Sequence, residues 1–332
     1  MPRVFVTRPI PDAGLKLLHE AFGADVVVSQ GDHPITRKAL LEGVRGVHGV
    51  LPILTDTMDE EVFEAAGPQL KVVANYAVGY NNVDVAAATR RGIVVTNTPG
   101  VLTETTADMA WTLMLAAARR VTESEHYLRA GEWKSWGPQL FLGVDIHGQT
   151  LGIFGMGRIG QAMARRARGF DMRVIYHDAG RLPLNRENVL NAVFVDKQTL
   201  LAESDFISIH CPLLPETTHA FGAAEFARMK PTAVLVNTAR GPIVDEAALA
   251  EALSAGRIFA AGLDVYEHEP EIHPALLASR NDVLLPHLGS ATRTTRARMA
   301  EMAAANLIAA LSGHNVPNCV NPEVLEIFTK RS

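Results

Sequence analysis

The chain has 332 residues, of which 48% are hydrophobic and 20% are charged, and its formal net charge is −5. This length is too great for one comfortable hydrophobic core and favours two domains. The composition excludes the disordered, collagen-like and coiled-coil classes. Because Lys and Arg (31) are fewer than Asp and Glu (36), no binding to nucleic acid or to an anionic membrane is expected.

Cysteine content and apolar runs predict the compartment. Two cysteines, Cys211 and Cys319, are too few for a disulfide framework, so a reducing compartment is expected. The apolar stretch near the N-terminus is far shorter than a signal-peptide core, and no run approaches the ~18 apolar residues of a membrane-spanning helix. We therefore expect a cytoplasmic enzyme with no membrane association.

Short β-branched runs alternate with amphipathic stretches through the first hundred residues. A helix is expected over Asp12–Ala21, because its leucines and Ala21 fall on one helical face. This alternation predicts a parallel sheet with helices on both faces. The expected strands are Val4–Thr7, Asp25–Val28, Gly49–Leu51, Val72–Asn75 and Ile93–Thr96.

A long helix and a second alternating series follow. Thr103–Val121 is expected to be helical, with Thr103 as N-cap and Arg119–Arg120 at the end where cations suit the helix dipole. Another helix is expected over Thr295–Leu311, after the last strand. Two such series predict two doubly wound α/β domains. The strands expected in the second series are Thr150–Phe154, Arg173–His177, Phe206–His210, Ala233–Asn237, Gly262–Tyr266 and Val283–Pro286.

The sharpest local signal is a glycine-rich turn after the strand Thr150–Phe154. Gly155, Gly157 and Gly160 match the pattern G-x-G-x-x-G, and a helix is expected through Gln161–Phe170. In dinucleotide-binding folds the first glycine permits the tight turn, and the second lets backbone amides approach a pyrophosphate. The third lets helix and strand pack closely, and the helix N-terminus adds partial positive charge. A purely structural turn is the alternative.

An acidic residue follows the next strand. Asp178 comes 18 residues after Gly160, close to the ~20-residue spacing of a carboxylate that binds the cofactor ribose. Such a carboxylate accepts hydrogen bonds from ribose hydroxyls and repels a 2′-phosphate, so NAD is expected rather than NADP. Arg181 and His177 lie near enough in sequence to weaken this preference. The alternative for Asp178 is a solvated turn residue.

Three titratable residues follow successive strands of the second series. Ligands of doubly wound sheets bind beyond the carboxyl ends of the strands, and Arg240, Glu269 and His287 are expected there. Each alone has another explanation: a surface cation, a loop charge before a proline, or a core histidine. Because all three residues follow a predicted dinucleotide-binding turn in the sequence, together they favour an oxidoreductase site. His210 also ends a strand, but the Cys-Pro pair after it indicates a turn that lines the cofactor.

Several segments carry a resemblance to a known family. Four of them are Gly155–Gly160, Asn237–Gly241, Gly262–Pro270 and Pro286–Thr292. Together they resemble the D-isomer-specific 2-hydroxyacid dehydrogenases over essentially the whole chain. The segments most similar to the glyoxylate and hydroxypyruvate reductases of that family, also called D-glycerate dehydrogenases, are Asn75–Asp84, Thr96–Thr105 and Gly131–Trp136.

The resemblance implies a discontinuous architecture. A flavodoxin-like substrate domain would take residues 1–101 and 288–332, and a Rossmann cofactor domain, residues 102–287, would be inserted into it. The helix that starts at Thr103 would begin the cofactor domain and help to form a homodimer. The arm around Trp133–Gly143 would lie near the partner's active site.

The resemblance also implies catalytic roles. His287 would donate a proton to the carbonyl oxygen in reduction and accept it in oxidation. Glu269 would pair with His287, fix its tautomer and favour its charged form. Arg240 would bind the substrate carboxylate and orient the carbonyl.

The implied ligand contacts extend to both domains. The amides of Val78 and Gly79 would hold the substrate carboxylate, so that the domains close on the substrate, and Leu54 would face its tail. The substrate-binding residues are thus Leu54, Val78, Gly79, Arg240 and His287. The residues implied in binding NAD, with NADP also possible, are Thr106, Gly155, Met156, Gly157, Arg158, Ile159, Gly160, Asp178, Cys211, Pro212, Thr238, Ala239, Arg240, Asp264, His287 and Gly289.

Positions at which the chain departs from family patterns narrow the range of expected substrates. Phosphite-oxidising members carry a lysine where Val78 stands, and formate dehydrogenases carry a glutamine where Glu269 stands, so neither substrate is expected. The Leu51–Asp56 loop has no cation to pair a phosphate, which disfavours 3-phosphoglycerate. Many glyoxylate reductases have Ser-Arg or Thr-Arg in place of Asp178-Ala179, a pattern that suits NADP.

The expected activity is NAD(P)H-dependent reduction of glyoxylate and hydroxypyruvate to D-2-hydroxy acids. A broader D-lactate or hydroxyphenylpyruvate dehydrogenase is an alternative, because the apolar Leu51–Leu54 segment permits a larger tail. A non-catalytic NAD-sensing protein, such as the transcriptional corepressors that share this fold, is the alternative outside the enzymes. No metal is expected, since His268 and His273 beside two glutamates are typical of a solvated loop.

Overall fold

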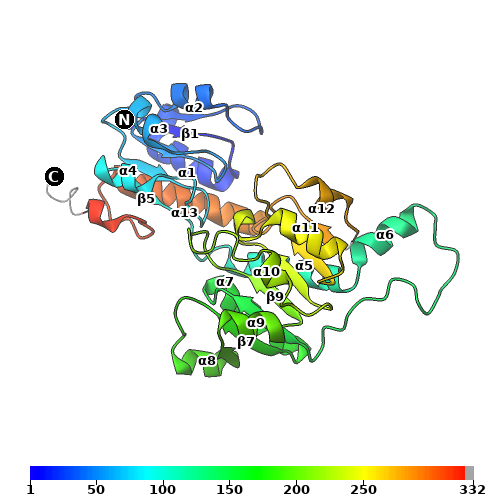
Figure 1. Ribbon diagram of the computed structural model, residues 1–332. Helices are drawn as coiled ribbons and strands as arrows, with labels where there is room; N and C mark the ends of the chain where they lie inside the picture. Colours follow the sequence, from blue (N-terminus) through cyan, green and yellow to red (C-terminus); the bar gives the residue numbers. More distant parts are fainter. Residues whose placement is uncertain (281, 326–332) are drawn as a thin grey trace. The chain divides into compact units, whose positions relative to one another are not determined.

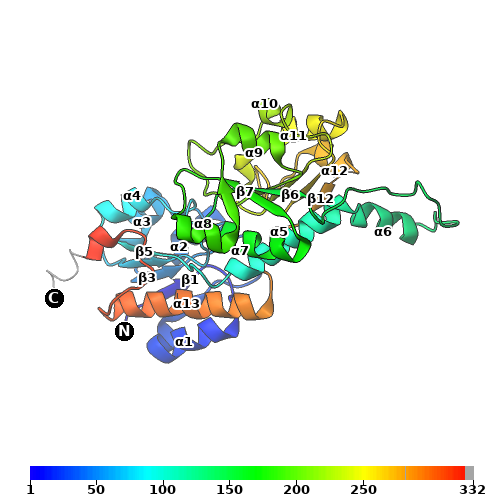
Figure 2. The same ribbon diagram turned by 90° about the horizontal axis from the view of Figure 1, so that it is seen from below.

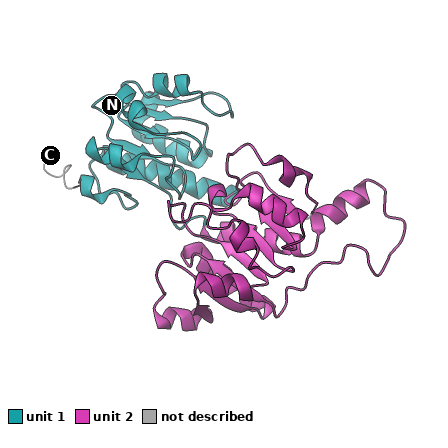
Figure 3. Ribbon diagram, in the orientation of Figure 1, with its two compact units in different colours: residues 1–102, 291–332 teal, residues 103–290 magenta. Residues whose placement is uncertain are grey.

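The computed structural model describes residues 1–280 and 282–325, and the chain divides into two compact units. Unit 1 contains residues 1–102 and 291–332, and unit 2 contains residues 103–290 (Figure 3). Leu102 was expected in the inserted domain but falls in unit 1, where it packs against that unit's core. Leu288–Ser290 were expected in the first domain but fall in unit 2, because the amides of Leu288 and Gly289 bind the carboxylate of Asp264.

Unit 1 is built on a parallel five-stranded sheet with the order β2-β1-β3-β4-β5. This is the flavodoxin-like strand order, as predicted. The strands are β1 (Val4–Val6), β2 (Val26–Val28), β3 (Gly49–Leu51), β4 (Val72–Ala74) and β5 (Val94–Thr96). The helices are α1 (Asp12–Phe22), α2 (Arg37–Gly43), α3 (Glu60–Ala66), α4 (Val85–Arg90) and α13 (Arg293–Leu311).

Helices cover both faces of this sheet. Helices α1 and α13 lie side by side on one face (Figure 2), where Gly14 is needed because a Cβ there would meet the carbonyl oxygen of Ala300 at 2.6 Å. Helices α2, α3 and α4 pack on the other face (Figure 1). Side chains of Thr36, Asp59, Asp84 and Thr292 accept backbone hydrogen bonds at helix starts, which supplies local start signals.

Unit 2 is built on a parallel seven-stranded sheet with the order β12-β11-β10-β9-β6-β7-β8. This is the Rossmann order with one added strand at its edge. The strands are β6 (Thr150–Phe154), β7 (Arg173–His177), β8 (Ala192–Phe194), β9 (Phe206–Ile209), β10 (Val234–Asn237), β11 (Ala260–Leu263) and β12 (Asp282–Leu284). The helices are α5 (Thr103–Ala118), α6 (Val121–Arg129), α7 (Arg158–Ala167), α8 (Leu184–Leu190), α9 (Lys197–Glu203), α10 (Ala223–Phe226), α11 (Glu246–Ser254) and α12 (Pro274–Ala278).

Two cores separate this sheet from its helices. Helices α5 and α7 supply one core, with Trp111 against Phe170 at 5.2 Å between ring centroids. Helices α9, α10 and α11 supply the core on the opposite face. None of the described helices is both long and apolar enough to cross a bilayer.

Several element boundaries differ from the sequence prediction. The long helix begins with Thr103 itself and stops at Ala118, because Arg120 adopts the left-handed conformation (φ 53°) before α6 starts. The strand expected at Gly262–Tyr266 is Ala260–Leu263, and strand Ala192–Phe194 was not predicted.

Two helix starts also lie earlier than expected. Helix α7 begins at Arg158 rather than Gln161, and its last turn tightens into a 3₁₀ helix through Phe170. Helix α13 begins at Arg293 rather than Thr295, because Thr292 caps it. The other expected strands agree with the structure to within two residues at each end.

Candidate active site

Arg240, Glu269 and His287 follow three neighbouring strands of unit 2. They come after β10, β11 and β12 respectively, and these strands pair in parallel. Carboxyl ends of parallel strands meet at one edge of the sheet, so the fold brings the three side chains to the same edge.

The imidazole of His287 is held by the carboxylate of Glu269. Nδ1 of His287 lies 2.9 Å from Oε2 of Glu269, and each side chain is 27% exposed. Oε1 of the same carboxylate accepts the backbone N–H of Tyr266 at 3.1 Å. With Nδ1 turned toward the carboxylate, Nε2 of His287 is the ring nitrogen left to meet a ligand.

The charges of the site balance one another. Burial alone would raise the pKa of Glu269, but the hydrogen bond and charge of His287, the Tyr266 amide and the charge of Arg240 outweigh it, so the pKa is lowered. Burial lowers the pKa of Arg240, opposed by the negative charge of Glu269. A guanidinium remains protonated under such conditions, so Arg240 is a fixed cation beside the pair.

The turn that carries Arg240 is fixed by Asn237. This buried amide donates to the Arg240 carbonyl (2.9 Å) and accepts the Ala239 N–H (3.0 Å). Gly241 follows, and a Cβ there would fall 1.8 Å from the backbone of Tyr266. Asn237 was predicted as the end of a strand and as part of a family segment, but not as the residue that holds this turn, because that role leaves no pattern in a single sequence.

Asp264 holds the turn that carries His287. Its carboxylate, 1% exposed, accepts the N–H of Leu288 at 2.6 Å and that of Gly289 at 2.7 Å. Its carbonyl accepts the N–H of His287 at 2.9 Å, and His287 has the left-handed φ of 56°. A non-glycine residue in that region costs on the order of 1 kcal/mol and needs such support. The predicted contact of Asp264 with the cofactor stays a prediction.

Thr106, from the first turn of α5, completes this corner. A Cβ on Gly289 would lie 3.4 Å from Cγ2 of Thr106 and 3.2 Å from Oδ2 of Asp264. Thr106, Asp264 and Gly289, three residues predicted to bind the cofactor, are therefore neighbours in space.

The glycine-rich turn between β6 and α7 has the geometry that its pattern predicts. Gly155 has φ 98°, and a Cβ there would meet the N–H of Cys211 at 2.4 Å. A Cβ on Gly160 would meet the Gly155 carbonyl oxygen at 2.2 Å, whereas one on Gly157 would meet nothing within 4 Å. The outer two glycines thus serve close packing, and the space beside Gly157 is open to a ligand.

Other predicted cofactor contacts surround this turn. Oδ2 of Asp178 accepts the Met156 N–H at 2.6 Å, which places the acid at the turn. The side chain of Met156 is buried in the core, so this residue has only its backbone to offer, whereas Arg158 is exposed and Ile159 is half-buried. Arg181, which could have favoured NADP, instead pairs with Glu187.

Two buried polar atoms at strand ends support a ligand in this region. Oγ1 of Thr238 and Nδ1 of His210 have no hydrogen-bond partner among the described residues. Burial lowers the pKa of His210 to about 3, so its ring is neutral. Cys211 is half-buried and Pro212 exposed beside it, and burial raises the pKa of the Cys211 thiol to about 12. Open space at Gly157, the amide-rich start of α7 and two polar atoms without a partner among the described residues fit a dinucleotide.

The predicted substrate residues of unit 1 lie in loops after β3 and β4. The carbonyls of Val78 and Gly79 accept from the side chains of Asn97 (2.8 Å) and Asn75 (2.9 Å). Neither backbone N–H donates to another described residue, so both can bind an anion. Leu54 is half-buried in a loop held by Asp56.

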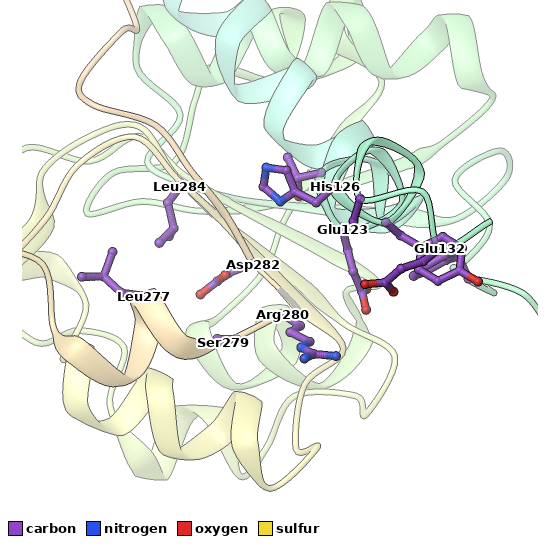
Figure 4. A pocket seen from close by; sticks show the side chains of 12 residues that line it. Glu123, His126, Glu132, Leu277, Ser279, Arg280, Asp282 and Leu284 are labelled. Atoms are coloured by element: carbon purple, nitrogen blue, oxygen red, sulfur yellow. The ribbon is translucent and has the colours of Figure 1, made fainter.

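A separate cavity of about 680 Å³ lies in unit 2 between α6 and the segment of α12 and β12 (Figure 4). It is lined by Glu123, His126 and Asp282 among others, and by none of the predicted site residues. Within residues 1–280 and 282–325, no group of His, Cys, Asp and Glu is arranged to hold a metal ion.

Comparison with known proteins agrees with this geometry. Residues 111–289 match the family model of the D-isomer specific 2-hydroxyacid dehydrogenase NAD binding domain. The chain is 53% identical over 329 residues to a glyoxylate reductase of Korarchaeum cryptofilum, covering 98% of each chain.

Solved structures agree as well. A glyoxylate reductase from Paecilomyes thermophila matches with a TM-score of 0.85 and 35% identity, covering 97% of this chain and 99% of that one. An NADPH-dependent glyoxylate/hydroxypyruvate reductase from Sinorhizobium meliloti, in complex with NADP and malonate, matches with a TM-score of 0.84 and 36% identity, covering 96% of each. The chain belongs to the D-isomer-specific 2-hydroxyacid dehydrogenase family and is an oxidoreductase that uses a nicotinamide cofactor.

Proposed function

We propose that this protein reduces glyoxylate and hydroxypyruvate to the corresponding 2-hydroxy acids with NADH, and oxidises D-glycerate in reverse. The observation that carries the proposal is the His287–Glu269 pair, with its free Nε2, at the sheet edge that also carries Arg240. The glyoxylate reductase relative at 53% identity supports this substrate class.

When bound, NADH supplies the hydride for the substrate carbonyl carbon. The residues that would hold it are Asp178 at the ribose, the amides after Gly157 at the pyrophosphate, and Thr106 and Thr238 along the site. Nε2 of His287 donates the proton that the carbonyl oxygen needs. Glu269 balances the positive charge of the imidazolium before transfer and keeps the ring oriented afterwards.

Arg240 binds the substrate carboxylate with its fixed positive charge and polarises the neighbouring carbonyl. Asn237 and Gly241 hold its turn rigidly, so little orientation is lost on binding. In unit 1, the free N–H groups of Val78 and Gly79 are the second predicted contact for the carboxylate.

Cofactor choice follows from Asp178. Its carboxylate accepts one backbone N–H and can accept ribose hydroxyls, whereas a 2′-phosphate would meet negative charge. The Sinorhizobium relative is described as NADPH-dependent, so NADH preference is a specific property that we propose for this chain.

The test is oxidation of NADH and of NADPH with glyoxylate, hydroxypyruvate, pyruvate and phenylpyruvate. We expect NADH oxidation to be fastest with glyoxylate and hydroxypyruvate. A preference for phenylpyruvate would instead support the broader D-lactate or hydroxyphenylpyruvate dehydrogenase. The apolar, half-buried Leu54 could then contact the phenyl group of that substrate. Tight NADH binding without turnover of any acid would instead support an NAD sensor.

We also infer that the protein is a homodimer that pairs through the arm formed by residues 121–143. The arm extends from the sheet of unit 2 in Figure 1, and Trp136 on it is 79% exposed. Other exposed apolar side chains on the arm are Val121, Leu128, Trp133, Leu140 and Leu142. Such a patch on one segment is typical of a protein interface. Light scattering should give twice the chain mass of 35.9 kDa, and a monomer would contradict the inference.

The remaining expectations stay proposals of the same kind. We propose a cytoplasmic location, in which the free thiols of Cys211 and Cys319 stay reduced. The balance of charges supports a small-molecule partner rather than nucleic acid.

A further inference from the structure

We propose that Glu187 makes the enzyme selective for NAD by holding Arg181 in a two-pronged ion pair, so that Arg181 is not available to a cofactor's 2′-phosphate. The proposal rests on the proposed use of NADH and assigns a residue to that selectivity. It concerns the segment between β7 and α8, which follows Asp178.

The pair has near-ideal geometry. Nε of Arg181 donates to Oε1 of Glu187 at 2.9 Å, and Nη2 donates to Oε2 at 2.8 Å. A guanidinium and a carboxylate joined by two parallel hydrogen bonds form the strongest common ion pair of proteins. The Nε–Nη2 edge of the Arg181 guanidinium is thereby occupied by a partner six residues along the chain.

The carboxylate is itself anchored in the core. Glu187 is 5% exposed, and its Oε1 also accepts the hydroxyl of Tyr176 at 2.7 Å. That hydroxyl in turn accepts the N–H of Leu182 at 2.8 Å. Burial and the neighbouring Glu187 raise the pKa of Tyr176 to about 12, whereas Arg181 and Tyr176 lower the pKa of Glu187.

Releasing Arg181 would therefore be costly. Both charge-assisted hydrogen bonds of the pair would be lost, and among the described residues the carboxylate would keep only the tyrosine hydroxyl as a partner. A 2′-phosphate would have to repay this cost before it gained from the arginine. Arg181 is 56% exposed, so access by solvent is not what restrains it.

The charged residues that follow β7 also bear on the choice between NAD and NADP. In the part of the chain that the structure describes, Asp178 forms no ion pair, and its carboxylate accepts the neutral amide of Met156. The charge of Arg181 is cancelled by Glu187. His177 is engaged with the Val195 carbonyl through Nδ1, and Nε of Arg186 donates to Gln161. Of the charged residues that follow β7, Asp178 therefore lies at the glycine-rich turn, Arg181 is neutralised by Glu187, and Arg186 is held by the neutral side chain of Gln161 on α7.

A structural role for the same pair makes a different prediction. If the pair only closes the loop, removing the charge of Glu187 should weaken folding or all nucleotide binding alike. If it restrains Arg181, removal should improve binding of nucleotides that carry a 2′-phosphate and leave the others unchanged.

The test is the Kd of NADH and NADPH for the full chain, measured by fluorescence titration without substrate. Glu187→Gln keeps the shape and an oxygen for Tyr176 but removes the charge. We expect NADPH affinity to rise about ten-fold, as for one new charge-assisted contact, and NADH affinity to stay within about two-fold. In the double variant Glu187→Gln/Arg181→Met the gain should vanish, because the arginine supplies it.

Two further variants complete the design. Tyr176→Phe removes a hydrogen bond from the same carboxylate but leaves the ion pair, and it should not change the NADPH-to-NADH ratio. Arg181→Met alone should also leave the ratio unchanged. Because it leaves Glu187 without its counter-charge, the double variant Glu187→Gln/Arg181→Met, which removes both charges, tests the ratio if either single variant does not fold.

Three results would overturn the proposal. They are a folded Glu187→Gln variant with an unchanged ratio, a gain that persists without Arg181, and a selective loss of NADPH affinity in Arg181→Met. Wild-type preference for NADPH would instead contradict the proposed cofactor, and because all readouts are binding constants, failure of the proposed substrate would leave them unaffected.

Discussion

The two ligand-facing regions of unit 2 are built in different ways. Beyond β10–β12, each proposed functional residue is held by another polar side chain: Glu269 holds the ring of His287, and Asp264 holds its turn. At the turn between β6 and α7, the geometry depends on side chains that are absent, since Gly155 and Gly160 leave room for backbone. Substitutions should therefore damage chemistry in the first region and binding or folding in the second.

The largest effect is expected at the proton donor. His287→Ala should lower kcat/KM by about 10³-fold, within the range for loss of a general acid, and leave the Kd of NADH nearly unchanged. His219→Gln is the matched control, because His219 also pairs with a glutamate, Glu267, outside the proposed site. Equal loss in both variants, or turnover unchanged in His287→Ala, would remove His287 as donor.

The next effect concerns the residue that positions the donor. Asp264→Asn keeps the size of the side chain but weakens its hold on two amides, so the turn of His287 should loosen. We expect kcat to fall about 10–100-fold, the scale of misplaced catalytic groups, with KM changed far less. The pH dependence of kcat should also shift, which a purely structural loss of active protein would not produce.

Two glycine variants test the second region, the turn between β6 and α7. Gly155→Ala should destabilise the fold by several kcal/mol, because its Cβ would meet the Cys211 amide at 2.4 Å and φ is 98°. Gly157→Ala should leave the melting temperature unchanged, since its Cβ meets nothing within 4 Å, yet weaken NADH binding by occupying ligand space. Normal NADH affinity in a folded Gly157→Ala would show that this space is not used.

The smallest effect is expected at the opposite end of β12. Burial raises the pKa of Asp282 to about 6 from 3.8, so its ionisation is disfavoured in the folded state. Protonated Asp282 is tolerated in the folded state, so its contribution to the free energy of unfolding is fully present below pH 3.8. That contribution is lost as the pH rises through 6 and the carboxyl group ionises. Asp282→Asn should thus add about 1 kcal/mol at pH 7.5 and nothing at pH 3.5. Denaturant unfolding at both values checks this, and an equal gain at both would contradict the pKa argument.

Sequence patterns predicted those features that depend on one residue type at one place. The glycine spacing, the parallel α/β class and the residues after each strand are of this kind, since each follows from periodicity or from a turn that only glycine allows. The order of the strands was implied only by the family resemblance. The strand at β11 was placed too late, because Val265 and Tyr266 are typical of strands although the chain leaves the sheet at Leu263.

Features that depend on pairs of distant residues were not predictable from one sequence. Asn237 acts on the turn before Arg240, and Glu187 acts on Arg181. Asn237 ends a strand and opens a family segment, and Glu187 lies in no predicted pattern, but neither position indicates which turn or side chain the residue holds, so only the folded arrangement reveals these roles. The break at Arg120 was missed for a similar reason, because arginine has no special preference for the left-handed conformation.

The return of the chain to unit 1 has a consequence for synthesis on the ribosome. Helix α13 packs on β3, β4 and α1 and supplies Met299, Ala303 and Leu307 to the core of unit 1. These residues emerge only after the whole of unit 2 has been made, whereas unit 2 is continuous in sequence. The part of the protein that is translated first therefore completes its core last, and until then it exposes an apolar sheet face to the chaperones that bind nascent chains.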